Sequence, residues 1–558
     1  MSRRKLGLAA AAVAAISIPF ALLAPGATAA PGLAGVSLAG PGDSTPPYGP
    51  FGFTTKGLGA TDNYGEPSLS VAPDGVHLVA STPGSTPDGG GVQYWHTANR
   101  GKTWKTTFST SPQGGGDSEL EYMPDGSIIS ADLEVTDSYI HRSTDHGKTW
   151  AAVGKAGVEQ DRQWFAHSPD GKTAYLVYHD FVLEAEMFAR SSDGGKTWPV
   201  SDGANQITSV DQITAPGIAK TQLNGTPASL LDQGVNTFSG PMLVDNNGKD
   251  LYVVYSISDL QSNIDPNAGV PPFGGTRGLV VMHSDQAGAA GSWTSHYAVT
   301  VPKNIQGSQE YQTATLFPWG MIDAKGTVYV VFNSTVGAPD DHFHQYYVYS
   351  TDKGKTFSKP VKLDKLPLGT GSATFAAGAA GAPGVIDVAW YESPTGVPSD
   401  DNSTWYVHFA QVVGADTPKP KVTEQAVTTI PNHTGGQCLQ GILCGIGPGS
   451  SDRSLLDFFE VVINPKTGMA GIAYADNHRL GLDAQENKIG EVVYAAQTTG
   501  RSALTPIPVE PPAKPPAKPP VNAGPNLAAT GMAPMMTITA LLLLTVGLLI
   551  RRRVRRTT

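Results

Sequence analysis

Short runs that alternate between apolar and polar residues recur along the middle of the chain. They are rich in β-branched and aromatic residues and occupy positions 76–82, 91–97, 175–180, 251–256, 328–334, 386–392 and 470–476. Turn sequences such as PDG, NNG and AKG lie between such runs, and helical periodicity is almost absent outside the two apolar ends. The pattern therefore predicts an all-β body built from short strands.

A turn sequence of the form S-x-D-x-G-x-T-W repeats within this body. Full copies begin at Ser143, Ser191 and Ser350, a degenerate copy begins at Thr97, and a more distant trace covers residues 284–293. This repeat resembles the Asp box, also called the bacterial neuraminidase repeat. Its Asp and Ser or Thr side chains can bond the turn backbone, its Gly permits a positive φ, and its aromatic ring packs into the next layer. We assign it a structural role and no catalysis.

Short strands and a repeat of about 45–65 residues indicate a β-propeller. We expect seven blades, with six as the alternative, in residues 31–500. The predicted inner strands begin near Gly65, Ser118, Arg162, Gly240, Thr313, Thr374 and Leu455. Residues 201–239 read as a long insertion in the fourth blade, and residues 32–55 are expected beside the final strands, where they close the ring.

Carboxylates recur where the predicted inner strands begin. They are Glu66, Glu119 with its neighbour Asp117, Asp161, Glu310 and Asp457, and Arg162 follows Asp161. In a propeller these positions gather at one mouth of the central channel, so we predict an acidic ligand-binding site there. Crowded carboxylates call for a cation, raised pKa values or a polar ligand. Such a ring can hold Ca²⁺ or a sugar, with Trp164 and Phe165 as stacking faces. The alternative is that these residues cap strands or bond neighbouring blades.

The repeat resembles that of the sialidases, whose propeller has six blades. That resemblance would imply three arginines for a substrate carboxylate, a Tyr nucleophile activated by Glu, and an Asp acid/base. The first of those arginines lies in an R-x-P pattern, and this chain has none. Within residues 31–500, Arg162, Arg277, Arg453 and Arg479 are the arginines available outside the repeats. We therefore expect a binding module for an extracellular glycan or protein. The alternatives are an exo-α-sialidase and another glycoside hydrolase that uses two mouth carboxylates.

The two ends of the chain predict export and anchoring. Residues 1–30 have a basic start, an apolar stretch and a small-residue cleavage site after Ala29 or Ala30, as in a signal peptide. At the other end, a proline-rich stalk (501–526) precedes LAATG (527–531), an apolar span (533–550) and a basic tail (551–558). This order resembles a sortase sorting signal of the LAxTG type. It implies cleavage between Thr530 and Gly531 and attachment to peptidoglycan by sortase; a plain membrane anchor is the alternative.

The net charge limits which partners the protein can bind, and the two cysteines indicate its compartment. The chain carries a formal net charge of −10, and removing the eight basic residues of the two ends leaves −18 for the exported part. A surface this acidic repels nucleic acid and anionic lipid. The two cysteines, Cys438 and Cys444, are close in sequence, so we expect a local disulfide in an oxidising compartment. We expect a monomer with no bound cofactor other than Ca²⁺.

Overall fold

The computed structural model describes residues 50–61, 64–84, 91–109, 115–134, 137–157, 160–198, 207, 235–260, 273–300, 317–335, 342–439, 452–485 and 488–507. Within these ranges all regular secondary structure is β-strand. None of the described segments forms a helix of the length and apolarity that a membrane crossing needs. The predicted signal peptide, sorting motif and apolar span lie outside the described residues, as do Thr530, Gly531 and positions 508–526 of the predicted stalk. Residues 501–507, predicted as the start of the stalk, belong instead to the compact unit that ends at Ile507, and Ala503 is buried.

The strands form seven antiparallel sheets, each a blade. Blade 1 holds β2 (Ser68–Val71), β3 (Leu78–Thr82), β4 (Gln93–Thr97) and β5 (Lys105–Phe108). Blade 2 holds β6 (Ser118–Tyr122), β7 (Ile128–Leu133), β8 (Ser138–Ser143) and β9 (Ala151–Ala156). Blade 3 holds β10 (Gln160–His167), β11 (Ala174–Asp180) and β12 (Ala185–Ser191). Blade 4 holds β13 (Val235–Val244), β14 (Leu251–Leu260), β15 (Phe273–Ser284) and β16 (Trp293–Thr300).

The last three blades follow the same plan. Blade 5 holds β17 (Trp319–Ile322), β18 (Val328–Ser334), β19 (His344–Ser350) and β20 (Val361–Lys362). Blade 6 holds β21 (Ser372–Ala380), β22 (Val385–Ser393), β23 (Thr404–Val413) and β24 (Lys421–Ala426), and β25 (His433–Thr434) pairs with β23. Blade 7 holds β26 (Glu460–Ile463), β27 (Ala470–Asp476), β28 (Glu491–Thr499) and the N-terminal strand β1 (Gly52–Ala60).

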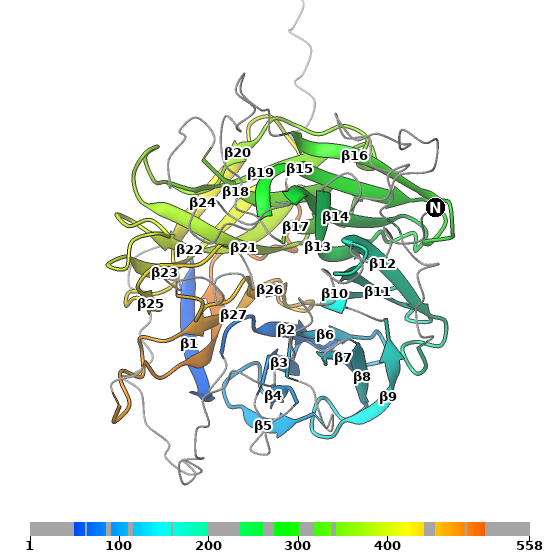
Figure 1. Cartoon of the computed structure of the whole chain (residues 1–558), viewed down its shortest axis with the longest axis horizontal. Helices are drawn as coiled ribbons and strands as arrows, with labels where there is room; N and C mark the ends of the chain where they lie inside the picture. Colours follow the sequence, from blue (N-terminus) through cyan, green and yellow to red (C-terminus); the bar gives the residue numbers. More distant parts are fainter. Residues whose placement is uncertain are drawn as a thin grey trace, which may run out of the picture. The chain divides into compact units, whose positions relative to one another are not determined.

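The first strands of the blades contact one another in a closed circle. β2 contacts β6, and the series continues through β10, β13, β17, β21 and β26 back to β2. Figure 1 shows the blades arranged around a common centre. The protein is therefore a seven-bladed β-propeller, as the sequence predicted. Six of the seven predicted inner strands coincide with or directly precede β2, β6, β10, β13, β21 and β26, and the one predicted near Thr313 lies outside the described residues.

The ring is closed by the N-terminal strand. β1 pairs antiparallel with β28, with Thr54 opposite Ala496. Phe53 is fully buried and packs edge-on against Phe409 of blade 6, with ring centroids 5.2 Å apart. The predicted closure is confirmed for residues 52–55, and residues 32–49 lie outside the described part of the chain.

The repeated turns join the third strand of a blade to its outer edge and pack on the preceding blade. Trp150 of blade 2 stacks on Tyr94 of blade 1 with ring centroids 4.3 Å apart. Gly147 has φ +82°, and a Cβ there would lie 2.8 Å from Val79 of blade 1. The glycine is therefore required both by its backbone conformation and by the close approach of the neighbouring blade. These turns fasten each blade to the one before it.

Candidate functional site

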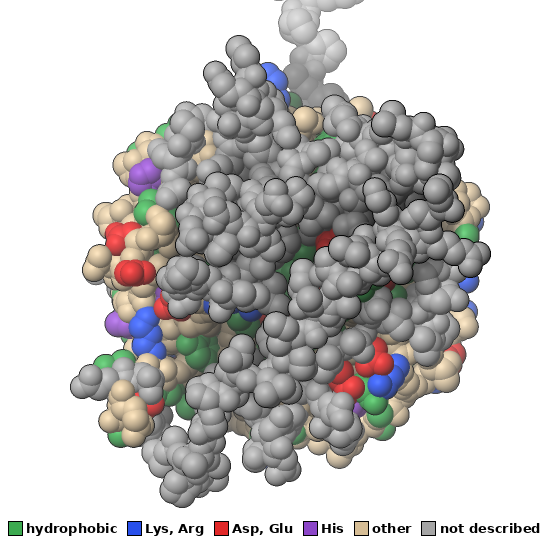
Figure 2. Space-filling model, viewed as in Figure 1, with side chains coloured by type: hydrophobic (Ala, Val, Ile, Leu, Met, Phe, Trp, Pro, Cys, Tyr) green, Lys and Arg blue, Asp and Glu red, His purple; other side chains and the backbone are tan. Residues whose placement is uncertain are grey.

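Four carboxyl groups from four consecutive blades meet where the inner strands begin. Asp457 precedes β26, Glu66 precedes β2, Asp117 precedes β6, and Asp161 is the second residue of β10. We call these four residues the acid cluster. Glu66 and Asp457 are buried, whereas Asp117 and Asp161 are partly exposed. Figure 2 shows acidic and apolar side chains near the middle of the face viewed in Figure 1.

The carboxyl groups of the acid cluster perturb one another. Burial, followed by repulsion from Asp117 and Asp457, raises the pKa of Glu66 well above its usual value, and Glu66 shares a side-chain hydrogen bond with Asp117. Burial also raises the pKa of Asp161 to about 6; Asp117 adds to this shift and His179 opposes it. The shift favours the protonated form of Glu66, which can donate its proton to the hydrogen bond with Asp117.

A single guanidinium partly balances this charge. Arg453 donates from Nη2 to Oδ2 of Asp457 at 2.7 Å. Burial opposes the charge of Arg453, yet its pKa is raised because Asp457 and Glu66 lie close. The backbone N–H of Asp457 donates to Oε1 of Glu66 at 3.1 Å. The last turn before β26 thus ties blade 7 to blade 1 at the mouth.

The backbone at the mouth adopts unfavourable conformations. Glu66 has φ 50°, Arg162 has φ 22° and Leu456 has φ 55°. Residues with side chains adopt positive φ at an energetic cost, and such strain concentrates at functional sites. Here it occurs at the entry to three of the four inner strands that carry the acid cluster.

Below the acid cluster lies a second, fully buried polar group. Arg162, 1% exposed, donates from Nη2 to Oε2 of Glu119 at 2.7 Å and from Nη1 to the carbonyl of Gln163 at 2.7 Å. Ser68 of blade 1 donates to Oε2 of Glu460 of blade 7 at 3.0 Å. Burial raises the pKa of Glu119 to about 7, although Arg162 opposes the shift. Burial and Glu119 raise the pKa of Glu460. This group connects blades 7, 1, 2 and 3 beneath the mouth.

Aromatic side chains pack at the centre of the propeller below Arg162. The Arg162 guanidinium lies 3.4 Å from the ring centroid of Trp164 and 3.9 Å from that of Phe458. Trp164 also packs against Phe317 and Trp319, with centroids 6.2 and 5.5 Å away. Trp164 is 0% exposed, and its indole N–H donates to the carbonyl of Ser239 at 2.9 Å. The cluster therefore forms an apolar floor to the mouth.

The structure separates the predicted site residues into two groups. Glu66, Asp161 and Asp457 lie together at the mouth, whereas Arg162, Glu119 and Trp164 are buried beneath it in contacts within the protein. The placement of Trp164 does not support the expected stacking face, because its ring is covered by protein. Phe165, also buried, packs against Trp198 with centroids 5.5 Å apart. Glu310 lies outside the described residues.

Sequence reasoning gave too little weight to three groups. Asp117 was noted only beside Glu119, yet it is the member of the acid cluster that bonds to Glu66. Arg453 was considered only as a sialidase arginine, and Glu460 was not singled out although it begins β26, three residues after Asp457. Their position just before or within an inner strand was the available signal. The disulfide is borne out at Cys438, which is disulfide-bonded; Cys444 lies outside the described residues.

The described arginines of residues 31–500 that lie outside the repeats face carboxylates of the protein itself. Arg162 pairs with Glu119 at 2.7 Å, Arg453 pairs with Asp457 at 2.7 Å, and Nε of Arg479 lies 3.8 Å from Oε1 of Glu491. The side chain of Arg277 lies outside the described residues. The three described arginines therefore do not form an open pocket for an anionic substrate.

Two sets of three side chains in the described part of the chain place possible metal-ligand atoms within 4.8 Å of one another, and neither belongs to the acid cluster. One is Glu392, His408 and Glu424 of blade 6, which is buried. There His408 Nδ1 lies 2.6 Å from Glu424, and Lys365 Nζ also lies 3.1 Å from Glu424, so this acid already has two protein partners. The other set is Asp74, His77 and His146, of which Asp74 is exposed and the two histidines are half-buried.

Comparisons with known proteins return distant propellers. No family model and no curated protein matches the chain. An α-L-arabinanase from Penicillium chrysogenum is 13% identical, covering 81% of this chain and 98% of its own, with a TM-score of 0.38. An α-L-arabinofuranosidase from Fusarium graminearum is 11% identical, covering 79% and 97%, with a TM-score of 0.38. A xyloglucanase from Xanthomonas campestris is 13% identical, covering 78% and 55%, with a TM-score of 0.39. At this level of similarity no function follows for this chain.

Proposed function

We propose that this protein is an extracellular propeller that binds a neutral glycan at the acid cluster. The supporting observation is that Glu66, Asp117, Asp161 and Asp457 converge at one mouth and are accompanied there by the single guanidinium of Arg453. Carboxylate oxygens accept hydrogen bonds from sugar hydroxyls, and these charge-assisted bonds are stronger than neutral ones. The same oxygens repel an anionic ligand. A neutral or amino sugar therefore suits the site better than a sialylated one.

The exposure of the four acids suggests how a ligand would be held. Asp117 and Asp161 are partly open to solvent and can meet ligand hydroxyls, whereas Glu66 and Asp457 are buried behind them. Glu66 shares a side-chain hydrogen bond with Asp117, and Asp457 is fixed by Arg453. The two open carboxylates are thus presented by a rigid backing, which lowers the entropy that binding must overcome.

One observation favours a second candidate, a glycoside hydrolase. Burial and the neighbouring Asp117 raise the pKa of Glu66, and glycosidases combine one carboxyl group of raised pKa with one that is ionised. In this alternative Glu66 is the general acid. The sialidase form of this alternative finds less support, because Arg162, Arg453 and Arg479 are occupied by protein carboxylates.

A glycan array of neutral, amino and sialylated sugars tests both candidates when retained protein and lost terminal sugar are read on the same spots. We expect retention on neutral or amino glycans. The Asp161→Asn variant should weaken retention about tenfold or more, because it removes one open carboxylate. Asp137→Asn is the matched control: Asp137 also precedes a strand (β8), but it pairs with Lys155 at 3.0 Å away from the acid cluster.

Three outcomes would decide against the binding proposal. They are retention on sialylated glycans alone, equal retention by the Asp161→Asn variant and the wild type, and loss of terminal sugar. Loss of sugar that disappears in Glu66→Gln would establish the hydrolase instead.

Export and wall attachment remain a separate proposal, drawn from the two ends of the sequence. A wall-released chain should end at Thr530, and mass spectrometry of its C-terminal peptide checks this.

A further inference from the structure

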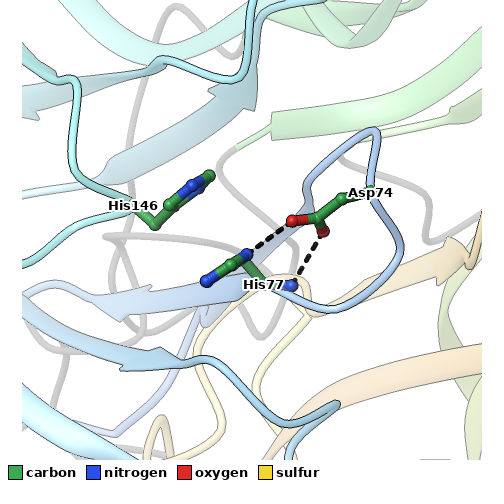
Figure 3. Close-up of side chains that lie close together, drawn as sticks. All are labelled: Asp74, His77 and His146. Carbon is green, nitrogen blue, oxygen red and sulfur yellow. Dashed lines mark hydrogen bonds and ion pairs between the residues drawn. The ribbon is translucent and has the colours of Figure 1, made fainter.

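Two histidines and an aspartate from adjacent blades meet on the propeller away from the mouth. Asp74 and His77 belong to the turn between β2 and β3, so they follow β2, whereas Glu66 of the mouth precedes it. His146 belongs to the repeated turn between β8 and β9 of blade 2. Figure 3 shows the three side chains facing one another across the boundary between the blades. One possible ligand atom from each lies within 4.8 Å of the other two.

The local contacts hold these side chains in place. Oδ2 of Asp74 lies 2.6 Å from Nδ1 of His77, and Oδ1 of Asp74 accepts the backbone N–H of Val76 at 2.7 Å. The imidazole rings of His77 and His146 are stacked with centroids 3.8 Å apart and planes inclined by 7°. The Tyr122 hydroxyl lies 3.4 Å from Nδ1 of His146, which leaves Nε2 of that ring for a ligand. Figure 3 shows the bonds between Asp74 and His77.

The donor atoms suit a metal ion. Asp74 offers a carboxylate oxygen, and His77 and His146 each offer an imidazole nitrogen. Neutral imidazole nitrogens and a carboxylate are the donors that zinc prefers.

We propose that Asp74, His77 and His146 bind Zn²⁺, or a divalent transition-metal ion of similar chemistry, and that the ion fastens blade 1 to blade 2. The ion would take the place of the proton between Asp74 and His77, with His146 as the third ligand and water completing the coordination. Ligand atoms about 3.3 Å apart surround a tetrahedral zinc with bonds of about 2.0–2.1 Å. The Asp74 and His77 side chains are 43% and 22% exposed, so solvent reaches them. Binding would require an imidazole ring to rotate, because the stacked rings of His77 and His146 are inclined by only 7° and their in-plane lone pairs do not yet converge.

The proposed metal site depends on His146, which occupies a position of the repeated turn where each copy carries a different residue. The residue after the turn Asp or Asn is Arg100 in blade 1, His146 in blade 2 and Lys353 in blade 5, with φ values of 59°, 62° and 63°. In blade 5, Lys353 reaches back to Asp250 of the preceding blade at 2.8 Å. Arg100 instead donates from Nε to the carbonyl of Gly75 in its own blade at 3.3 Å, so the partner of this side chain differs between blades. In blade 2 the position carries an imidazole that stacks on His77 of blade 1. The comparison also suggests the variant His146→Lys, because lysine adopts the same backbone conformation at this position in blade 5.

Calorimetric titration of the EDTA-treated full-length protein with Zn²⁺ tests the proposal. We expect a binding event in the wild type that His146→Lys and His77→Gln each weaken about tenfold or more. His296→Gln, which alters a half-buried histidine of β16 far from these side chains in sequence, is the matched control and should leave the affinity unchanged. Zn²⁺ should also raise the melting temperature of the wild type, because a ligand that binds the folded state stabilises it. Ca²⁺ and Mg²⁺, which prefer oxygen ligands, should do neither.

The proposal fails if wild-type affinity for Zn²⁺ persists in both His146→Lys and His77→Gln, because the binding would then lie at other residues. It also fails if the wild type gives no Zn²⁺ heat and no rise in melting temperature. Each variant is first shown to have a wild-type melting temperature without metal. If His77→Gln does not, His146→Lys decides alone, since lysine occupies the same backbone conformation in blade 5.

Discussion

At the residue scale, the aspartate of each repeated turn serves as the acceptor that holds the turn. Oδ1 of Asp145 accepts the Ser143 hydroxyl at 2.8 Å and the Thr149 N–H at 2.9 Å, while Oδ2 accepts the Thr149 hydroxyl at 2.7 Å. Asp193 and Asp352 make the same contacts with their own turns. Although burial opposes it, these bonds lower the pKa of all three aspartates to about 2. The turns therefore stay intact until strongly acidic pH.

Asn99 shows which part of this chemistry needs the charge. It stands at the equivalent position of blade 1, accepts the Thr97 hydroxyl at 2.8 Å and donates to the Thr103 hydroxyl at 2.8 Å. We therefore predict that Asp193→Ala lowers the free energy of unfolding by about 1–2 kcal/mol, whereas Asp193→Asn lowers it by clearly less. Denaturant titration measures both. Equal losses in the two variants would mean that charge, and not hydrogen bonding, holds the turn.

At the element scale, the hairpin of β11 and β12 contains a buried ion pair. His179 of β11 lies directly opposite Glu186 of β12, with Nδ1 3.2 Å from Oε1, and its Nε2 lies 3.6 Å from Glu184 in the connecting turn. Burial opposes the charge of His179, but the two glutamates raise its pKa to about 10. The histidine also lies close enough to Asp161 to oppose the rise in pKa of that acid. The hairpin therefore links the third blade's stability to the electrostatics of the mouth.

This pair gives the propeller a defined pH dependence. The pKa of an unfolded histidine is about 6.5, so the folded state holds the extra proton between about pH 6.5 and 10. The contribution of the pair is complete below about pH 6.5 and is lost as the pH rises through about 10. We predict that His179→Gln lowers the free energy of unfolding by about 3–5 kcal/mol at pH 6, because Glu186 is left buried without its cation.

Denaturant titrations at pH 6, 8 and 10 measure this. The wild type should lose stability across the series relative to His179→Gln, and the difference between the two proteins should shrink toward pH 10. His296→Gln is the control for a histidine in a β-strand that has no such pair. A difference that stays constant or grows with pH would show that His179 acts through packing alone.

Strand entry points were predictable, whereas the partners of their side chains were not. The alternation of apolar residues and the repeated turn were enough to place β2, β6, β10, β13, β21 and β26. Which charged residue faces ligand depends on distances between blades that are far apart in sequence. Arg162 and Asp161 are neighbours in the sequence, yet Arg162 turns inward to Glu119 while Asp161 stays at the mouth. The bulge between Asp161 and Gln163 breaks the alternation that would otherwise assign their faces.

At the scale of the whole molecule, the ring depends on one short strand from the N-terminal part. β1 pairs with β28 along its length, and Phe51 and Phe53 pack on Phe409 of blade 6. The side-chain amide of Gln425 in blade 6 also bonds both the N–H and the carbonyl of Phe51, at 3.1 and 2.9 Å. Blade 7 is thus completed, and joined to blade 6, by residues that precede blade 1.

We predict that deleting residues 31–61 leaves a protein with a lower melting temperature and a strong tendency to aggregate. Its β28 would become an exposed edge with unpaired backbone groups, and edge strands of this kind recruit other chains. Thermal unfolding with light scattering measures both effects. Deleting residues 508–526, which lie outside the compact unit that ends at Ile507, is the control and should change neither. A propeller that keeps its melting temperature without residues 31–61 would show that β1 is dispensable.

Because β1 pairs with β28, the ring can close only near the end of synthesis. Gly52 leaves the ribosome early, but its partner Thr499 is made near the end of the chain. At about 5–20 residues per second, the strand waits roughly 20–90 s for that partner. During this interval the nascent protein is an open arc with two unsatisfied ends, and no partial product can complete the circle. Any cellular system that keeps this chain from aggregating has that whole interval in which to act.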